Sequence, residues 1–149
     1  GSDVEALVKG LQDGTIDCIA TDHAPHTKAD KARSFEDAAF GISGLETALG
    51  SLMALVREGR LNMTTLVDRL TSGPARVLDR PDLCQATLRP GSPADVTIFD
   101  PEAEWVVDST KFVSKGKNTP LEGVRLKGRV MVTIVDGRVV YEDEAAKVG

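Results

Sequence analysis

The densest group of titratable side chains lies in one short string, Thr21-Asp22-His23-Ala24-Pro25-His26, directly after an apolar run. A carboxylate in that position can bind a divalent metal ion and can also exchange a proton with a metal-bound hydroxide. Asp22 is therefore the first candidate for a catalytic and metal-ligating residue. The competing interpretation is that Asp22 caps the following loop, while both histidines are polar surface residues.

The residues before this string predict a helix, a tight turn and a buried strand. Apolar side chains at helical spacing predict a helix over 4–12, and Asp13-Gly14 ends it. The β-branched run over 16–21 suits a strand that is buried in a sheet. A helix, a turn and a buried strand are half of a repeating α/β unit, and active sites in such folds lie at the carboxyl ends of the strands.

Alternation along the predicted strand sorts the nearby candidates. Cys18 shares a strand face with Asp22 but lies deeper, so we expect it to be a buried residue in preference to a thiolate ligand. His23 is turned away from that face, and we expect a structural or solvent role for it in preference to metal ligation.

The rest of the chain divides near residue 80 into a helical part and a β-rich part. A polar loop is expected over 27–43, and helices over 45–56, 62–70 and 72–78. Beyond residue 80, Pro and Gly separate β-rich runs at 95–99, 105–107, 125–135 and 138–141. Asp136-Gly137 is the strongest hairpin signal in the chain.

Composition limits the classes of protein that fit. The 149 residues are 41% hydrophobic and 28% charged, which is typical of a globular domain. A formal charge of -5 with interleaved signs makes nucleic acid a poor partner, and no apolar run is long enough to span a membrane. No secretory signal is visible, and Gly1-Ser2 resembles an expression remnant. Cys18 and Cys84 are expected to be reduced thiols of a cytoplasmic protein.

The string at 21–26 resembles the last metal-site motif of the dihydroorotases, which are members of the amidohydrolase superfamily. The run at 35–47 is similar to their substrate loop and final barrel helix, and Ser72-Gly73-Pro74-Ala75-Arg76-Val77-Leu78 to the exit from the barrel. The runs at 91–100 and 132–141 resemble the return strand and closing hairpin of their small β domain. Several ordered motifs therefore coincide along almost the whole chain.

The resemblance implies a role for each matching residue. Asp22 would be the metal-site carboxylate and the general acid/base, and His26 would contact the carboxylate of dihydroorotate or carbamoyl aspartate. Phe40 and Gly41 would offer backbone groups to the pyrimidine ring, although Ala39 stands where many relatives have Pro. The implied cofactor is zinc, one or two ions. The implied reaction is the reversible cyclisation of N-carbamoyl-L-aspartate to dihydroorotate in pyrimidine biosynthesis.

The implied fold is α/β plus β, and it corresponds to the C-terminal portion of the family. Residues 3–80 would be the last strand and flanking helices of a TIM-type (β/α)8 hydrolase barrel. Residues 81–143 would be the C-terminal part of the small β-sandwich domain, and 144–149 a tail. With two histidines and no His-x-His pair, the chain alone is expected to hold no zinc and to be inactive.

Partners and alternatives follow from the same resemblance. The expected partners are the small-molecule substrate, the missing N-terminal part of the same protein and a second copy in a homo-oligomer. Aspartate transcarbamoylase is a possible further partner, and a non-catalytic dihydroorotase-like structural role is the non-enzymatic alternative. The enzymatic alternative is another cyclic amidohydrolase, a hydantoinase or an allantoinase.

Overall fold

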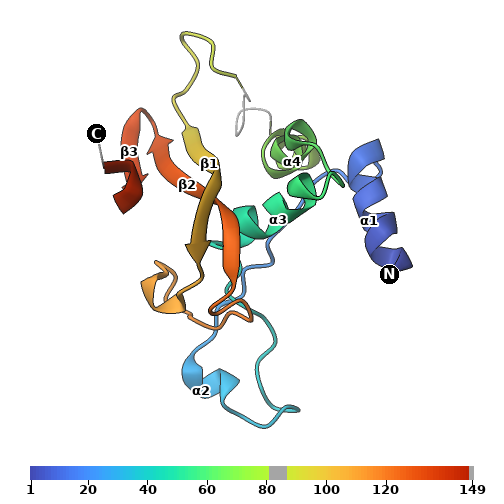
Figure 1. Cartoon of the computed structure of the whole chain (residues 1–149), viewed down its shortest axis with the longest axis vertical. Helices are drawn as coiled ribbons and strands as arrows, with labels where there is room; N and C mark the ends of the chain where they lie inside the picture. The colour runs from blue at the N-terminus through green and yellow to red at the C-terminus, as the bar shows by residue number, and fades with distance from the viewer. Residues whose placement is uncertain (81–86, 148–149) are drawn as a thin grey trace. The chain divides into compact units, whose positions relative to one another are not determined.

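The computed structural model describes residues 1–80 and 87–147 (Figure 1). Its helices are α1 (Ser2–Asp13), α2 (Lys28–Lys31), α3 (Ala48–Arg57), α4 (Met63–Leu70) and α5 (Ser72–Val77), with 3-10 turns at Ser109–Lys111 and Glu144–Lys147. The strands β1 (Val96–Val106), β2 (Arg125–Val135) and β3 (Arg138–Glu142) form a sheet in the order β1-β2-β3. Cys84 lies outside the described residues, so its predicted thiol state stays a prediction.

The chain forms two compact units. The first unit comprises Gly1–Ala20, Leu52–Asp100 and Val130–Gly149, and the second comprises Thr21–Ser51 and Pro101–Arg129. The string that holds Asp22 and the loop after it belong to the second unit. The division into two domains at 80/81 is inferred from the family resemblance. It adjoins residues that the structure does not describe, so it stays a prediction.

One arginine joins helices α1 and α4 of the first unit. Asn62 caps α4 by accepting a hydrogen bond from the N–H of Thr65 at 2.7 Å, in agreement with the helix predicted over 62–70. At the other end of α4, the guanidinium of Arg69 donates to the carbonyl oxygen of Leu11 from Nε at 3.1 Å and from Nη2 at 3.0 Å. It thereby satisfies a carbonyl in the last turn of α1, which has no partner within the helix. Leu66 of α4 is fully buried.

A carboxylate between α4 and α5 gives the first unit a pH dependence. The hydrogen bonds from Arg76, together with the charges of Arg76 and Arg69, lower the pKa of Asp68 below its ordinary 3.8. Because the folded pKa is the lower one, this interaction contributes its full stability above pH 3.8 and loses it as pH falls through the folded pKa. We expect Asp68→Asn to flatten this acidic limb in urea unfolding measured at several pH values. An unchanged slope between stability and pH would contradict the assignment.

The predicted hairpin is confirmed. Asp136 and Gly137 have φ angles of 49° and 72°, the two left-handed residues that a type I′ turn requires. β2 pairs antiparallel with β3, Val135 opposite Arg138 and Val132 opposite Glu142, with an irregularity between Thr133 and Ile134.

The sheet corrects the prediction of two separate strands at 95–99 and 105–107. β1 runs without a break through Pro101, which had been expected to interrupt it. β1 lies at the edge of the sheet, where a residue without an N–H is tolerated on the unpaired side. Proline therefore does not end a strand here.

The buried strand predicted over 16–21 is wrong for this chain. These residues form no strand, and none of them is buried. The N–H of Ile19 donates to the carbonyl oxygen of Arg69 at 2.9 Å, so the backbone bonds to a helix end in place of a neighbouring strand. Apolar β-branched residues favour a strand only where another strand supplies the hydrogen-bonded ladder.

The second unit has a small hydrophobic core. Val107, Phe112 and Leu126 are buried together, with Trp105 and Leu121 packed against them. The indole N–H of Trp105 donates to the carbonyl oxygen of Gly128 at 3.1 Å, which satisfies the polar end of this packing residue. No helix among residues 1–80 and 87–147 is long and apolar enough to cross a membrane.

Candidate active site

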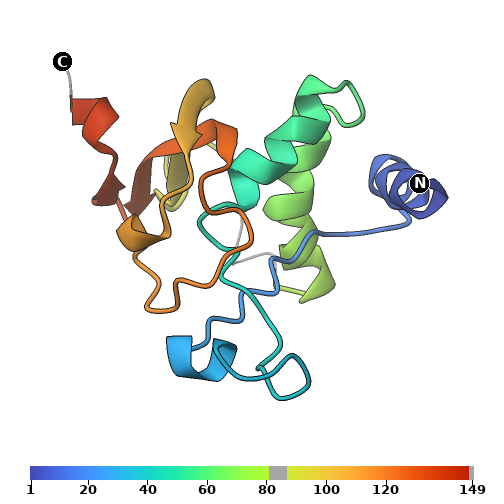
Figure 2. The same ribbon diagram turned by 60° about the horizontal axis from the view of Figure 1, so that its bottom comes forward.

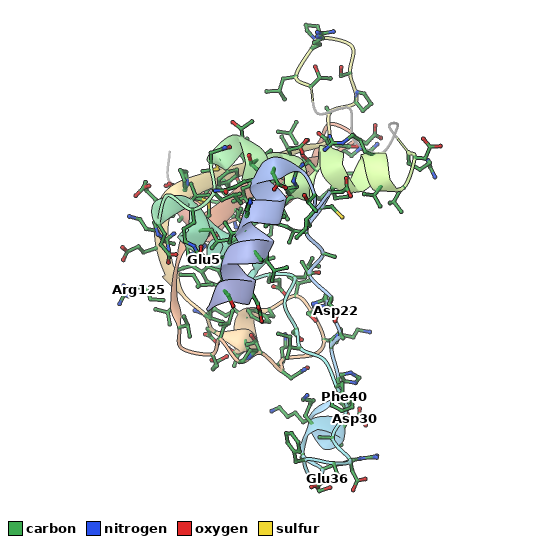
Figure 3. The ribbon with its side chains drawn as sticks, turned by 90° about the vertical axis from the view of Figure 1, so that its right-hand side faces the viewer. Glu5, Asp22, Asp30, Glu36, Phe40 and Arg125 are labelled. Atoms are coloured by element: carbon green, nitrogen blue, oxygen red, sulfur yellow. The ribbon has the colours of Figure 1, made fainter. Side chains whose placement is uncertain are left out.

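Asp22 presents an exposed carboxylate at the start of the second unit, and Figure 3 shows it on the chain segment that leads to the loop carrying Phe40. Its φ is 45°, in the left-handed region that Asp tolerates better than most residues. Within the described residues no hydrogen bond or ion pair holds this carboxylate. It is therefore chemically available, whereas both ring nitrogens of the next residue, His23, are engaged.

His23 is fixed on both sides of its ring. Its Nδ1 accepts hydrogen bonds from the N–H groups of Gly44 at 3.2 Å and Leu45 at 3.1 Å. Because an accepting Nδ1 carries no proton, the neutral ring has its proton on Nε2, which lies 3.3 Å from Oγ of Ser114. Both nitrogens are thus used in holding the loop, in agreement with the structural role expected for His23.

Three short segments meet around Asn118, and Figure 2 shows the 112–120 segment beside the loop that precedes α3. The N–H of His26 donates to Oδ1 of Asn118 at 3.1 Å, and Nδ2 of Asn118 donates to the carbonyl oxygen of Gly41 at 3.0 Å. The carbonyl oxygen of Asn118 accepts from the N–H of Ser43 at 2.8 Å. One residue thereby joins the chain at 26 to the chain at 41–43.

Close backbone approach accompanies these bonds. A Cβ on Gly116 would lie 2.3 Å from Cβ of Pro25, so only glycine fits there. The buried hydroxyl of Ser43 donates to the carbonyl oxygen of Gly116 at 2.7 Å. This hydrogen bond stabilises the contact between the two segments, because loss of the hydroxyl would leave a buried carbonyl oxygen without a partner.

α2 and its lysine brace the loop from the other side. Thr27 and Asp30 form a capping box at the start of α2, and the hydrogen bonds from Thr27 lower the pKa of Asp30. Nζ of Lys31 donates to the carbonyl oxygens of Ala39 at 2.8 Å and Gly41 at 3.2 Å. The loop expected over 27–43 is therefore partly helical and internally bonded.

The structure brings two of the four predicted site residues together. His26 and Gly41 share Asn118, and a Cβ on Gly41 would lie 3.3 Å from Nε2 of His26. The side chain of Phe40 is 88% exposed. No hydrogen bond or ion pair joins Asp22 to these three residues within the described part of the chain.

Sequence reasoning missed the residues that hold the loop, namely Lys31, Ser43, Gly116 and Asn118. The polar run Lys115-Gly116-Lys117-Asn118 carries a loop signal only. Nothing in that signal says which other segment the loop meets.

The described residues do not fit a metal centre by themselves. Zinc sites in proteins use three or four nitrogen, oxygen or sulfur ligands from the chain. Asp22 supplies one carboxylate, and both ring nitrogens of His23 are engaged elsewhere. Across residues 1–80 and 87–147, no group of three or more His, Cys, Asp and Glu side chains is placed to hold one ion.

The model of the amidohydrolase family matches residues 3–141. The chain belongs to the amidohydrolase family. It is 51% identical over 139 residues to the dihydroorotase of Desulforapulum autotrophicum, covering 93% of this chain and 32% of that protein. It is 49% identical over 142 residues to the dihydroorotase of Syntrophus aciditrophicus, covering 95% of this chain and 33% of that protein.

Comparison with a solved structure agrees with this family assignment. The L-hydantoinase (dihydropyrimidinase) of Arthrobacter aurescens superimposes with a TM-score of 0.80 at 35% identity. The match covers 91% of this chain and 31% of that one. The chain thus shares its fold with part of an amidohydrolase, and it spans about a third of the length of the curated relatives it matches.

Proposed function

We propose that the protein containing this chain is a dihydroorotase, which hydrolyses the cyclic amide dihydroorotate to N-carbamoyl-L-aspartate and catalyses the reverse ring closure. The observation that carries the proposal is identity of about half over almost the whole chain with curated dihydroorotases. The Asp22-His23-Ala24-Pro25-His26 string is the part of the chain whose chemistry fits that reaction. The reaction would serve pyrimidine biosynthesis.

The proposed fold is the last part of a barrel followed by part of a small β domain. An isolated parallel bridge between His23 and Ile42, with the N–H of Ala24 donating to the carbonyl oxygen of Ile42 at 2.9 Å, supports parallel pairing at this place. We infer that the run over 16–21 becomes a strand where the complete protein provides its neighbours. Residues 3–80 and 81–143 keep their proposed assignments to the two domains.

Asp22 is the proposed general acid/base. In hydrolysis its carboxylate takes a proton from the attacking water and delivers it to the ring nitrogen as the amide C–N bond breaks. In ring closure the same carboxylate takes a proton from the carbamoyl nitrogen as the C–N bond forms, and it gives that proton to the departing hydroxyl group, which leaves as water. Asp22 is also the ligand that this chain would contribute to zinc, and the other ligands must come from outside the described residues.

His26 and the 40–41 backbone are the proposed substrate contacts. A ring N–H of His26 suits the carboxylate of the substrate. The carbonyl oxygen of Gly41 is already used by Lys31 and Asn118, so it is not the group that meets the pyrimidine ring. The N–H groups of Phe40 and Gly41 are the remaining donors, and they complement the carbonyl oxygens of the ring.

A hydantoinase is the second candidate, because a hydantoinase structure shares the fold at 35% identity. The test compares dihydroorotate, hydantoin and allantoin as substrates of the complete native protein loaded with zinc. We expect dihydroorotate to have the highest kcat/KM by at least about tenfold, since polar subsites discriminate strongly between substrates that differ in a charged group. A preference for hydantoin would replace the proposal. No turnover of any of the three would favour a non-catalytic role beside a partner such as aspartate transcarbamoylase.

A further inference from the structure

We propose that Asn118 is a positioning residue that sets the distance between His26 and the Phe40-Gly41 backbone. It does so through the two ends of its side-chain amide. The proposal rests on the proposed function for the identity of the substrate, but the geometry that carries it does not. Asn118 is 92 residues from His26 and 77 from Gly41 in the sequence, so only the fold places it between them.

The two hydrogen bonds require an amide and not merely a polar side chain. Oδ1 accepts from a backbone N–H, and Nδ2 donates to a backbone carbonyl. Turning the amide over would place N–H against N–H and oxygen against oxygen, so the orientation is fixed by its partners. Aspartate would keep the acceptor for His26 and put a second oxygen against the carbonyl of Gly41.

The backbone of the same segment is held independently of this side chain. The carbonyl oxygen of Asn118 accepts from Ser43, and Gly116 is in close contact with Pro25. Substitution of the Asn118 side chain therefore leaves the segment in place. What it removes is the direct bond from the segment to His26 and to Gly41.

A precise spacing matters because the two proposed contacts hold opposite ends of one small ligand. His26 would take the carboxylate, and the N–H groups of Phe40 and Gly41 would take the ring. Misplacing one contact relative to the other loses binding without touching Asp22, whose carboxylate carries the proposed proton transfer. Asn118 should therefore act on KM more than on kcat.

The experiment compares Asn118→Asp and Asn118→Ala with Asn62→Ala in the complete native protein. Asn62 is a matched control because its side chain also accepts a backbone N–H, but in the first unit at the start of α4. Hydrogen exchange is measured over 24–27 and 39–44, and KM and kcat are measured with dihydroorotate. Asn118→Asp loses the hydrogen bond to Gly41 and Asn118→Ala loses both bonds, so we expect exchange of these segments to be faster by roughly fivefold or more in both variants, with no change in Asn62→Ala.

The kinetic expectation is a rise in KM of roughly tenfold with kcat changed by less than about threefold in the Asn118 variants. In Asn118→Asp, protonation of the new carboxyl restores a donor, so its KM relative to the parent should fall toward acidic pH while that of Asn118→Ala stays level. Unchanged exchange in the two segments overturns the proposal whatever the kinetics. Faster exchange with unchanged KM overturns its functional part. A parent protein without activity on dihydroorotate would refute the proposed function, and hydrogen exchange would still decide the role of Asn118.

Discussion

Replacing Asp22 with Asn is expected to lower kcat of the complete native protein by about 10³-fold, because general acid/base catalysis by a positioned side chain contributes about that much. Asn has nearly the shape of Asp and tolerates a left-handed backbone equally well, so the φ of 45° imposes no new strain. The carboxylate of Asp22 has no hydrogen bond to lose within the described residues. The metal-free variant should therefore unfold at the temperature of the metal-free parent, while turnover of the zinc-loaded variant collapses.

Glu36→Gln is the control for this prediction. Glu36 is an exposed acidic residue in the loop of the same unit, and Figure 3 shows it at the far end of that loop from Asp22. Its neutralisation removes the same charge without touching the proposed proton path, so turnover should stay within about twofold, as for ordinary surface substitutions. Equal losses in the two variants would mean that loop charge, and not a specific carboxylate, supports the reaction. Full activity of Asp22→Asn would eliminate Asp22 as the general acid/base.

Local features of this fold were predictable because their causes lie within a few residues. Asn62 starts α4 by bonding the N–H of Thr65, three positions along the chain. Asp136 and Gly137 form the hairpin because both residues accept positive φ angles. In both cases the residues that select the structure are also the residues that form it.

Features that depend on distant partners were not predictable in the same way. The run over 16–21 has the composition of a buried strand, yet a strand also needs neighbours, and the nearest backbone partner of Ile19 is a carbonyl at the end of a helix. β1 shows the converse, because its edge position tolerates Pro101. The network around Asn118 is the clearest case, because its partners are 77 and 92 residues away.

The residues of the candidate site also differ in how far they can be predicted from the sequence. Asp22 and His26 stand out because titratable groups gather at the end of an apolar run, and their type and order carry the chemical signal. Lys31, Ser43 and Asn118 carry no such signal, since each acts by bonding backbone atoms of another segment. A sequence thus indicates the groups that react more readily than the groups that hold them. The roles of Asp22, His26, Phe40 and Gly41 stay predictions until the variants are measured.

Gly41→Ala is expected to raise KM by roughly a hundredfold, which corresponds to about 3 kcal/mol of lost binding. Gly41 has a φ of 115°, a conformation that residues with a side chain rarely adopt, and this strain alone costs about 1–3 kcal/mol. A Cβ there would also lie 2.5 Å from Cβ of Ala24 and 2.9 Å from its carbonyl oxygen. The loop must move away from Ala24, and it carries the proposed ring contacts with it.

Gly59→Ala is the control that introduces a side chain at a positive φ angle without a steric clash. Gly59 also has a positive φ, 68°, but a Cβ there would meet nothing within 4 Å. We expect this control to lower the unfolding temperature slightly and to leave KM unchanged. Equal changes in KM for the two variants would show that the close approach to Ala24 has no special role.

The double variant Ala24→Gly/Gly41→Ala completes a double-mutant cycle for the contact between residues 24 and 41. Removing the methyl group of Ala24 eliminates the 2.5 Å clash but leaves the 2.9 Å approach to the Ala24 carbonyl and the backbone strain. KM should therefore recover in part, and the coupling between the two substitutions should be favourable, as for residues in direct contact. Strictly additive effects would place the cause in the φ angle and the approach to the Ala24 carbonyl, and not in the methyl group of Ala24. Partial recovery would show that the clash with the methyl group of Ala24 contributes to displacing the proposed ring donors.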